Sequence, residues 1–341
     1  MPLFIVSETS LQSLSIADLE HVFKQSSFGR YMVTNEIASR HHRMLTTYFA
    51  DTNAFMATLR SLGAVISGSF ALDYILGKEH TLQSDLDIYV PFTNFEAMKT
   101  YLKEVEGYNE DAHLARRRAE IARALAERRE AAIERMIDNS PEYVSVPLET
   151  GIVQVAALNK GNCKVDIIQN QSASSLYAIT RFWSTLQMNY ICASGYCCAY
   201  PQTTFRLEGV VSPHVMLNNM TPHDFVYPLV EKYERRGYDF RFNWYEPEQA
   251  GCRENHEHMF CPSRRRSFDD GVSYCGTFGS EDEPPAFNDT RGAFVSEWKV
   301  GWQLGGRHEQ SDVRFPSPAR AWHSVTGQGE RRTQYTVGGL V

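Results

Sequence analysis

One segment, residues 63–90, constrains the fold more than any other part of the sequence. Its sequence is GAVISGSFALDYILGKEHTLQSDLDIYV. The pattern predicts a short strand over 64–67, a turn at Gly68 and Ser69, a helix over about 70–76 and then a second strand. Strands and helices in this alternating order favour a sheet that is covered by helices.

The second strand of this segment carries two acids, Asp85 and Asp87. Side chains at positions i and i+2 of a strand project from the same face, so the two carboxylates converge while Leu86 and Ile88 face the core. Like charges on an apolar strand are costly to bury unless a cation offsets them. Mg²⁺ is commonly held by one or two carboxylates and substrate phosphates, so the pair predicts a divalent-cation site. The alternative is a solvated strand end without a ligand.

The turn before the helix suits the same chemistry. Gly68 allows the backbone to approach a phosphate closely. The N–H groups at the start of the following helix, beginning with Ser69, attract anions. The alternative is that this glycine serves only a tight turn.

A third acid, Asp166, lies in a later strand-like run. Two apolar runs, GIVQVAALN and NCKVDIIQ, are joined around Gly161 and predict a hairpin. If this hairpin lies beside the Asp85 strand, Asp166 is close to the first two acids. Lys160 and Lys164 are the nearest basic candidates for contacts with a triphosphate, although surface lysines often serve only solubility.

These features together resemble the nucleotidyltransferase superfamily of the DNA polymerase beta type, which includes CCA-adding enzymes and antibiotic nucleotidyltransferases. The resemblance rests on a Gly-Ser turn that opens a helix, an Asp-hydrophobic-Asp strand and an acid on a later strand. A longer stretch, about residues 45–210, looks like a group of uncharacterised fungal nucleotidyltransferase-fold proteins. The similar segments are GSFALDYIL, SDLDIYVPF, KVDIIQNQSAS, RFWSTLQMNYI and YPQTTF.

The resemblance implies metal-dependent transfer of a nucleoside monophosphate from an NTP, such as ATP, to an acceptor hydroxyl. It implies that Asp85 and Asp87 bind Mg²⁺ or Mn²⁺, and that Asp166 binds one ion and helps to deprotonate the acceptor. Gly68 and Ser69 would hold the β- and γ-phosphates. The acceptor would be a small molecule, an RNA or a protein. The alternative is a catalytically inactive module of the same fold that binds a nucleotide or a protein.

Composition predicts a soluble intracellular protein, either cytoplasmic or nuclear. The seven cysteines are odd in number and scattered, which suits a reducing compartment better than a disulfide framework. No window approaches the roughly 18 apolar residues of a membrane span, and the N-terminus lacks the basic region of a signal peptide. The net charge of −7 argues against a general binder of polyanions.

We therefore expect an α+β fold, with a nucleotidyltransferase-like mixed β-sheet and helices packed on one face. An inserted charged helix at 111–138 is expected from its balanced charges and narrow apolar stripe. The expected parts are an N-terminal helical segment at 1–44, the catalytic core at 45–195, a C-terminal α+β region with a long loop at 196–306, and a flexible tail at 307–341.

Helical periodicity and capping residues predict several further helices. They cover about residues 16–23, with Ser15 as the cap, and 35–62, 95–107, 174–193 and 223–237. Strands are expected within 238–245 and 293–306, whereas Gly, Pro and Ser make 247–288 mostly loop.

That loop-rich region contains a set of candidate zinc ligands. They are Cys252, His256, His258, Cys261 and Cys275. Their spacing differs from the usual paired Cys-x-x-Cys arrangement, so side chains without metal are the preferred interpretation and a structural zinc is the alternative.

Overall fold

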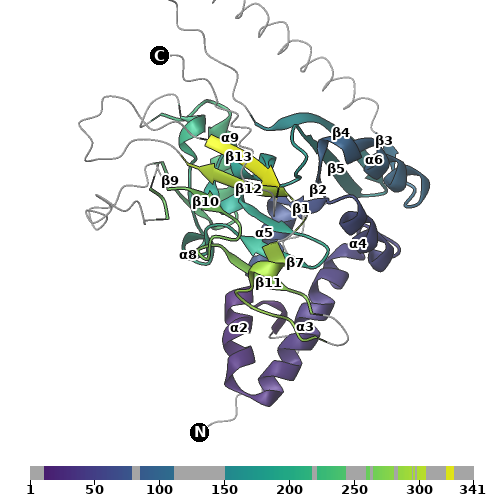
Figure 1. Cartoon of the computed structure of the whole chain (residues 1–341), viewed down its shortest axis with the longest axis vertical. Coiled ribbons are helices and arrows are strands. Elements are labelled where there is room, and N and C mark those ends of the chain that lie inside the picture. The colour runs from purple at the N-terminus through teal and green to yellow at the C-terminus, as the bar shows by residue number, and fades with distance from the viewer. Residues whose placement is uncertain are drawn as a thin grey trace, which may run out of the picture.

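The computed structural model of the chain is shown in Figure 1. The described residues are 11–78, 85–110, 150–216, 221–242, 259–261, 264–279, 283–293, 295, 298–304 and 320–325. Within them the fold is α+β, with one large mixed sheet, two small sheets and α-helices, as the sequence predicted. The expected charged helix at 111–138 lies outside the described residues.

The large sheet has eight strands in the order β11-β7-β6-β1-β2-β5-β4-β3. These strands are β1 (Val65–Ser67), β2 (Asp85–Val90), β3 (Asn109–Glu110), β4 (Ile152–Lys160), β5 (Cys163–Asn170), β6 (Asn189–Ile191), β7 (Gly195–Cys198) and β11 (Tyr274–Thr277). Within this sheet β2 and β5 are parallel and every other neighbouring pair is antiparallel. The predicted hairpin is therefore confirmed as β4 and β5, and it lies beside the Asp85 strand.

Five helices cover one face of this sheet (Figure 1). They are α2 (Ile16–Gln25), α3 (Ser27–Leu45), α4 (Thr52–Ser61), α5 (Gly68–Leu76) and α6 (Phe95–Glu104). Alternate residues of the central strands point into this layer, including Ile66, Leu86, Ile88, Val165 and Ile167, and all five are fully buried. The intervening residues of β1, β2 and β5 therefore project from the opposite face.

The opposite face is covered by a second apolar layer and a small sheet. That sheet consists of β10 (Arg266–Ser267), β12 (Trp298–Gln303) and β13 (Arg320–Val325). Tyr89 and Ile168 of the large sheet are buried in the same layer as Trp302. A third apolar cluster joins α5 to α9 (Val226–Glu234) and to the two-stranded sheet of β8 (Glu208–Val210) and β9 (Asp239–Arg241). The short helix α8 (Pro201–Thr204) precedes β8.

The N-terminal helices agree with the sequence in one place and differ in another. Ser15 caps α2 as predicted, and it forms a reciprocal capping box with Asp18. The single helix expected over 35–62 is wrong, because the chain forms α3 and then α4. Asp51 separates the two, since its carboxylate accepts the first N–H groups of α4 and thereby favours a new helix start.

The helix expected over 174–193 is also wrong. The chain instead forms two 3₁₀ turns, at Ala178–Arg181 and Thr185–Gln187, and then β6. Asn170 accepts the backbone N–H of Ala178, and Ser184 accepts that of Leu186, so side chains take over the role of helical hydrogen bonds. Nearly all of this segment is buried, which removes the solvent-facing side that helical periodicity would reveal.

The expected divisions of the chain do not coincide with the sheets. The position between 195 and 196 falls inside β7, and the loop-rich region supplies β11 to the same large sheet. Part of the expected flexible tail, residues 320–325, is strand β13, which pairs along its length with β12.

Candidate active site

The parallel strands β2 and β5 bring the three predicted acids together near their first residues. In the register of this pair, Asp87 lies directly opposite Asp166, and Asp85 lies opposite Lys164. All four side chains belong to the face that points away from helices α2–α6. The prediction that Asp166 lies on a strand adjacent to Asp85 and Asp87 is therefore confirmed.

The turn at Gly68 lies beside Asp87 on the other side of β2 from Asp166. Strand β1 is antiparallel to β2 and pairs Ser67 with Asp87, so the chain leaves β1 at Gly68 beside the Asp87 carboxylate. Gly68 has φ +69°, and a Cβ built on it would lie 2.4 Å from Asp87 Oδ2. Any other residue would collide with this carboxylate and strain the backbone, so the turn requires glycine.

The acids differ in exposure, and their proximity changes the proton affinity of Asp87. Asp85 is half exposed and Asp166 is 13% exposed, whereas Asp87 is partly buried. Burial raises the pKa of Asp87 to about 7, the negative charges of Asp166 and Asp85 add to the rise, and Lys164 opposes it. Asp87 therefore ionises near neutral pH, and a cation bound beside it would favour the ionised form.

Lys164, which the sequence suggested for phosphate contacts, pairs with the acids. Its Nζ lies 3.1 Å from Asp166 Oδ2 and 3.8 Å from Asp85 Oδ2. The lysine is thus a resident cation between two of the three acids. The other candidate, Lys160, lies over the ring of Tyr108 at 5.5 Å.

Helix α9 and the turn after it contribute side chains that sequence reasoning did not assign to the site. Ser69 Oγ is hydrogen-bonded to the Tyr233 hydroxyl at 2.9 Å and accepts a bond from Arg236 Nη1 at 3.2 Å. Lys232 lies near enough to lower the pKa of Asp87 slightly. The sequence predicted this helix, but only the packing of α9 against α5 reveals that Tyr233 and the following Arg236 reach Ser69.

The chemistry of these residues fits a divalent cation, although the described residues contain no group of three or more His, Cys, Asp or Glu that already has the geometry of a metal site. Asp85, Asp87 and Asp166 offer the hard oxygen donors that Mg²⁺ and Mn²⁺ prefer. The raised pKa of Asp87 arises from burial and like charge, and a cation would relieve both effects.

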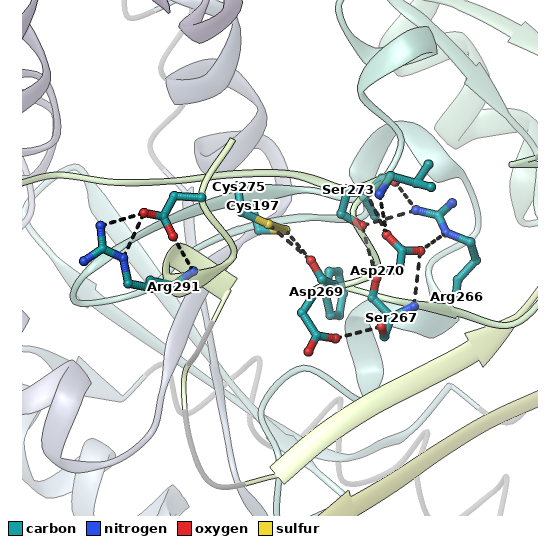
Figure 2. The surroundings of a disulfide bond; sticks show 12 residues. Cys197, Arg266, Ser267, Asp269, Asp270, Ser273, Cys275 and Arg291 are labelled. Atoms are coloured by element: carbon teal, nitrogen blue, oxygen red, sulfur yellow. Dashed lines mark hydrogen bonds and ion pairs between the residues drawn. A yellow bond between two sulfur atoms is a disulfide. The ribbon is translucent and has the colours of Figure 1, made fainter. Parts of the chain in front are cut away.

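The candidate zinc ligands are not assembled among the described residues. Cys275 forms a disulfide with Cys197, its direct partner across strands β11 and β7, so it is not available as a thiolate ligand (Figure 2). Cys261 is a buried thiol, and Cys252, His256 and His258 lie outside the described residues. The sequence did not predict this disulfide, whereas Cys192 and Cys198 are buried thiols.

None of the helices in the described segments is both long and apolar enough to cross a membrane. Comparison of the chain with known proteins found no matching family model, no matching curated protein and no matching solved structure. The resemblance to nucleotidyltransferases therefore stays a prediction from the sequence.

Proposed function

We propose that this protein is a metal-dependent nucleotidyltransferase, which transfers a nucleoside monophosphate from an NTP to an acceptor hydroxyl. One observation carries the proposal: Asp87 faces Asp166 across two parallel strands and touches the Gly68 turn at the start of α5. Two facing carboxylates beside a helix N-terminus suit a site that binds a cation and a phosphate together.

In this proposal each residue has a defined task. Asp85, Asp87 and Asp166 hold Mg²⁺ or Mn²⁺, which would offset the negative charge that develops on the phosphates during in-line displacement. Asp166 also accepts the proton of the attacking hydroxyl, and pyrophosphate leaves. Gly68 and Ser69, at the start of α5, bind the phosphate chain through N–H groups that no side chain caps.

A second candidate is a module that binds a nucleotide or a protein without catalysis. The observation in its favour is the pairing of Lys164 with Asp85 and Asp166, because an internal ammonium already supplies positive charge where the metal would bind. The two candidates differ in one measurable property. In the enzyme, a metal ion would replace the Lys164 ammonium beside Asp85 and Asp166. In the non-catalytic module, the ammonium would stay paired with these acids.

The deciding experiment is nucleotide transfer by the purified full-length chain. Each of the four labelled NTPs is incubated with Mg²⁺ or Mn²⁺ and with RNA, protein and small-molecule acceptors, and both label transfer and pyrophosphate release are measured. We expect Asp87→Asn and Asp166→Asn to reduce transfer by roughly a hundredfold or more, because each removes a charge used in the chemical step.

A matched control is Asp289→Asn, since Asp289 pairs with Arg291 on the surface and lies outside the site. This variant should keep full activity. Transfer that persists in Asp87→Asn would contradict the proposal. A wild type that binds no Mg²⁺ and transfers no label from any NTP would favour the non-catalytic module.

A further inference from the structure

We propose that helix α9 and the turn that follows it form a phosphate-binding face of this site, in which Arg236 and Lys232 contact the polyphosphate chain of a nucleoside triphosphate at Ser69. The inference rests on the proposed function for the identity of the ligand. Its structural argument depends mainly on α5, α9 and the turn that follows α9.

The first argument is the state of the Arg236 guanidinium. Nη1 donates to Ser69 Oγ at 3.2 Å, whereas Nη2 is buried and has no hydrogen-bond partner among the described residues. Within the same part of the chain, no carboxylate forms an ion pair with Arg236. Leaving a charged donor buried and unsatisfied is unfavourable. An anion at Ser69 would supply the missing acceptor, and phosphate matches the paired N–H groups of a guanidinium.

The second argument is that Arg236 is held in place for such a contact. Its guanidinium carbon lies 4.9 Å from the centre of the Tyr233 ring, and the Tyr233 hydroxyl is hydrogen-bonded to Ser69. Tyr233 is buried in the cluster that joins α9 to α5. A ligand at Ser69 would thus meet a preorganised side chain, which reduces the entropy lost on binding.

The third argument is the sum of positive charge around Ser69. The first N–H groups of α5 and the Arg236 guanidinium meet at Ser69, and the exposed Lys232 lies in the last turn of α9, just before Arg236. Polyphosphates carry several negative charges and would bridge this positive side to a cation held by Asp87. A neutral acceptor molecule would gain little from this arrangement.

The chain offers a matched control in the neighbouring residue. Arg235 belongs to the same turn of the chain, but its side chain is 72% exposed and pairs with Glu231. Arg235→Gln therefore removes the same charge as Arg236→Gln without touching Ser69. Arg236→Lys keeps the charge and removes the paired N–H geometry.

The test is a binding titration of the full-length chain with ATP, inorganic tripolyphosphate and adenosine, each with and without Mg²⁺. We expect wild type to bind ATP and tripolyphosphate but not adenosine. Arg236→Gln should weaken both phosphate ligands by about tenfold or more, and Arg236→Lys and Lys232→Gln should weaken them by roughly threefold. Arg235→Gln should stay within about twofold of wild type. Thermal unfolding of each variant confirms that it is folded, and Lys232→Gln provides the same test on an exposed residue should Arg236→Gln fail to fold.

Two results would overturn this inference: unchanged affinity for ATP and tripolyphosphate in both Arg236→Gln and Lys232→Gln, or a wild type that binds neither ligand. The outcomes also separate the two proposals. Phosphate binding that depends on Arg236, in a wild type that transfers no nucleotide from any NTP, supports this inference and contradicts the proposed reaction. Nucleotide transfer with an unchanged KM for NTP in Arg236→Gln supports the proposed reaction and contradicts this inference.

Discussion

Two clusters, one around Asp270 and one around Asp87, differ in how the negative charge of the aspartate is balanced. In the first, Asp270 forms an ion pair with the buried Arg266 and accepts the backbone N–H groups of Val272 and Ser273 at 2.9 Å each (Figure 2). In the second, Asp87 faces another carboxylate, Asp166, and touches a glycine. Arg266 balances the charge of Asp270, whereas the described residues give Lys164 as an ion-pair partner of Asp166 and Asp85 but not of Asp87.

The pKa values of Asp270 and Asp87 are shifted in opposite directions. Burial alone would raise the pKa of Asp270, but the Arg266 guanidinium and several hydrogen bonds hold it below its ordinary value. Burial also raises the pKa of Asp87, and its neighbour Asp166 raises it further, to about 7. A buried acid whose charge is balanced locally supports the fold, whereas one whose charge remains to be balanced indicates a place for a ligand.

Removing the cation of the first cluster should have the largest effect on stability. Arg266→Met leaves Asp270 without its ion pair and also removes the bond from Arg266 to the Ala199 carbonyl. We expect the free energy of unfolding to fall by about 3–5 kcal/mol, because an uncompensated charge stays buried. Urea denaturation measures this loss.

The control for Arg266→Met is Arg291→Gln. Arg291 is exposed and pairs with Asp289 on the surface (Figure 2), so this variant should leave the urea midpoint unchanged. Adding Asp270→Asn to Arg266→Met should recover part of the loss, since the two residues interact directly. A loss below about 1 kcal/mol for Arg266→Met would show that the cluster is not a structural element.

The disulfide beside this cluster should have the next largest effect. Replacing Cys197 and Cys275 together by alanine removes a covalent link between β7 and β11, and we expect a loss of about 2–4 kcal/mol. Reducing the wild type should lower its stability similarly and should not affect the double variant. If titration of the unfolded, unreduced wild type finds every cysteine as a thiol, the pair is not formed in solution.

In the second cluster, removing an acid should stabilise the protein. Asp87→Asn relieves the repulsion with Asp166 while keeping side-chain size. Because the folded-state pKa of Asp87 is raised to about 7, the folded wild type retains a proton that the unfolded chain releases near pH 4. The contribution of Asp87 to the stability of the wild type therefore falls as pH rises from about 4 to 7. The variant should gain nothing near pH 4 and about 1–3 kcal/mol at pH 8, without metal.

The difference in unfolding free energy between variant and wild type is the quantity to measure, at pH steps from 4 to 8. His41 and His214 have pKa values lowered by burial, so they favour stability at higher pH, and taking the difference cancels their contribution. A gain that does not depend on pH would contradict the assigned proton affinity of Asp87. A loss at every pH would show that Asp87 is structural.

The smallest effect on stability is expected when Lys164, the cation that pairs with the acids, is replaced. Lys164→Gln removes partly exposed ion pairs to Asp85 and Asp166, so metal-free stability should fall by roughly 0.5–1 kcal/mol. Mg²⁺ should then bind more tightly, because no ammonium competes for the acids. Calorimetric titration with Mg²⁺ measures this, and weaker binding in the variant would mean that Lys164 assists the metal instead of competing with it.

The sequence predicted the carboxylate cluster well because strand alternation is a local rule. The spacing of Asp85 and Asp87, with Leu86 between them, predicts which side chains share a face without knowledge of the partner strand. The hairpin around Gly161 then required only one assumption, that it pairs with β2, to place Asp166. Glycine at position 68 was also predicted to allow a close approach, although its nearest neighbour is a carboxylate.

The remaining features depend on contacts that no local pattern encodes. Helical spacing in the segment 174–193 was misleading because burial on all sides leaves no polar face to set the period. Strand β11 lies in a region rich in turn residues, and its pairing with β7 is fixed only by tertiary packing. Arg236 was visible in the basic segment that ends the predicted helix, yet only its contact with Ser69 in the folded chain relates it to the site.

The parallel pairing of β2 with β5 also determines how the site assembles during synthesis. A parallel pair needs a crossover, so Asp87 leaves the ribosome well before Asp166, and Arg236 follows later still. The entropy cost of closing such a crossover grows slowly, by about 0.6 kcal/mol for each doubling of its length. The register that brings Asp87 to Asp166 is therefore fixed by the late pairing of β5 with β2, and not by contacts between neighbours in the sequence.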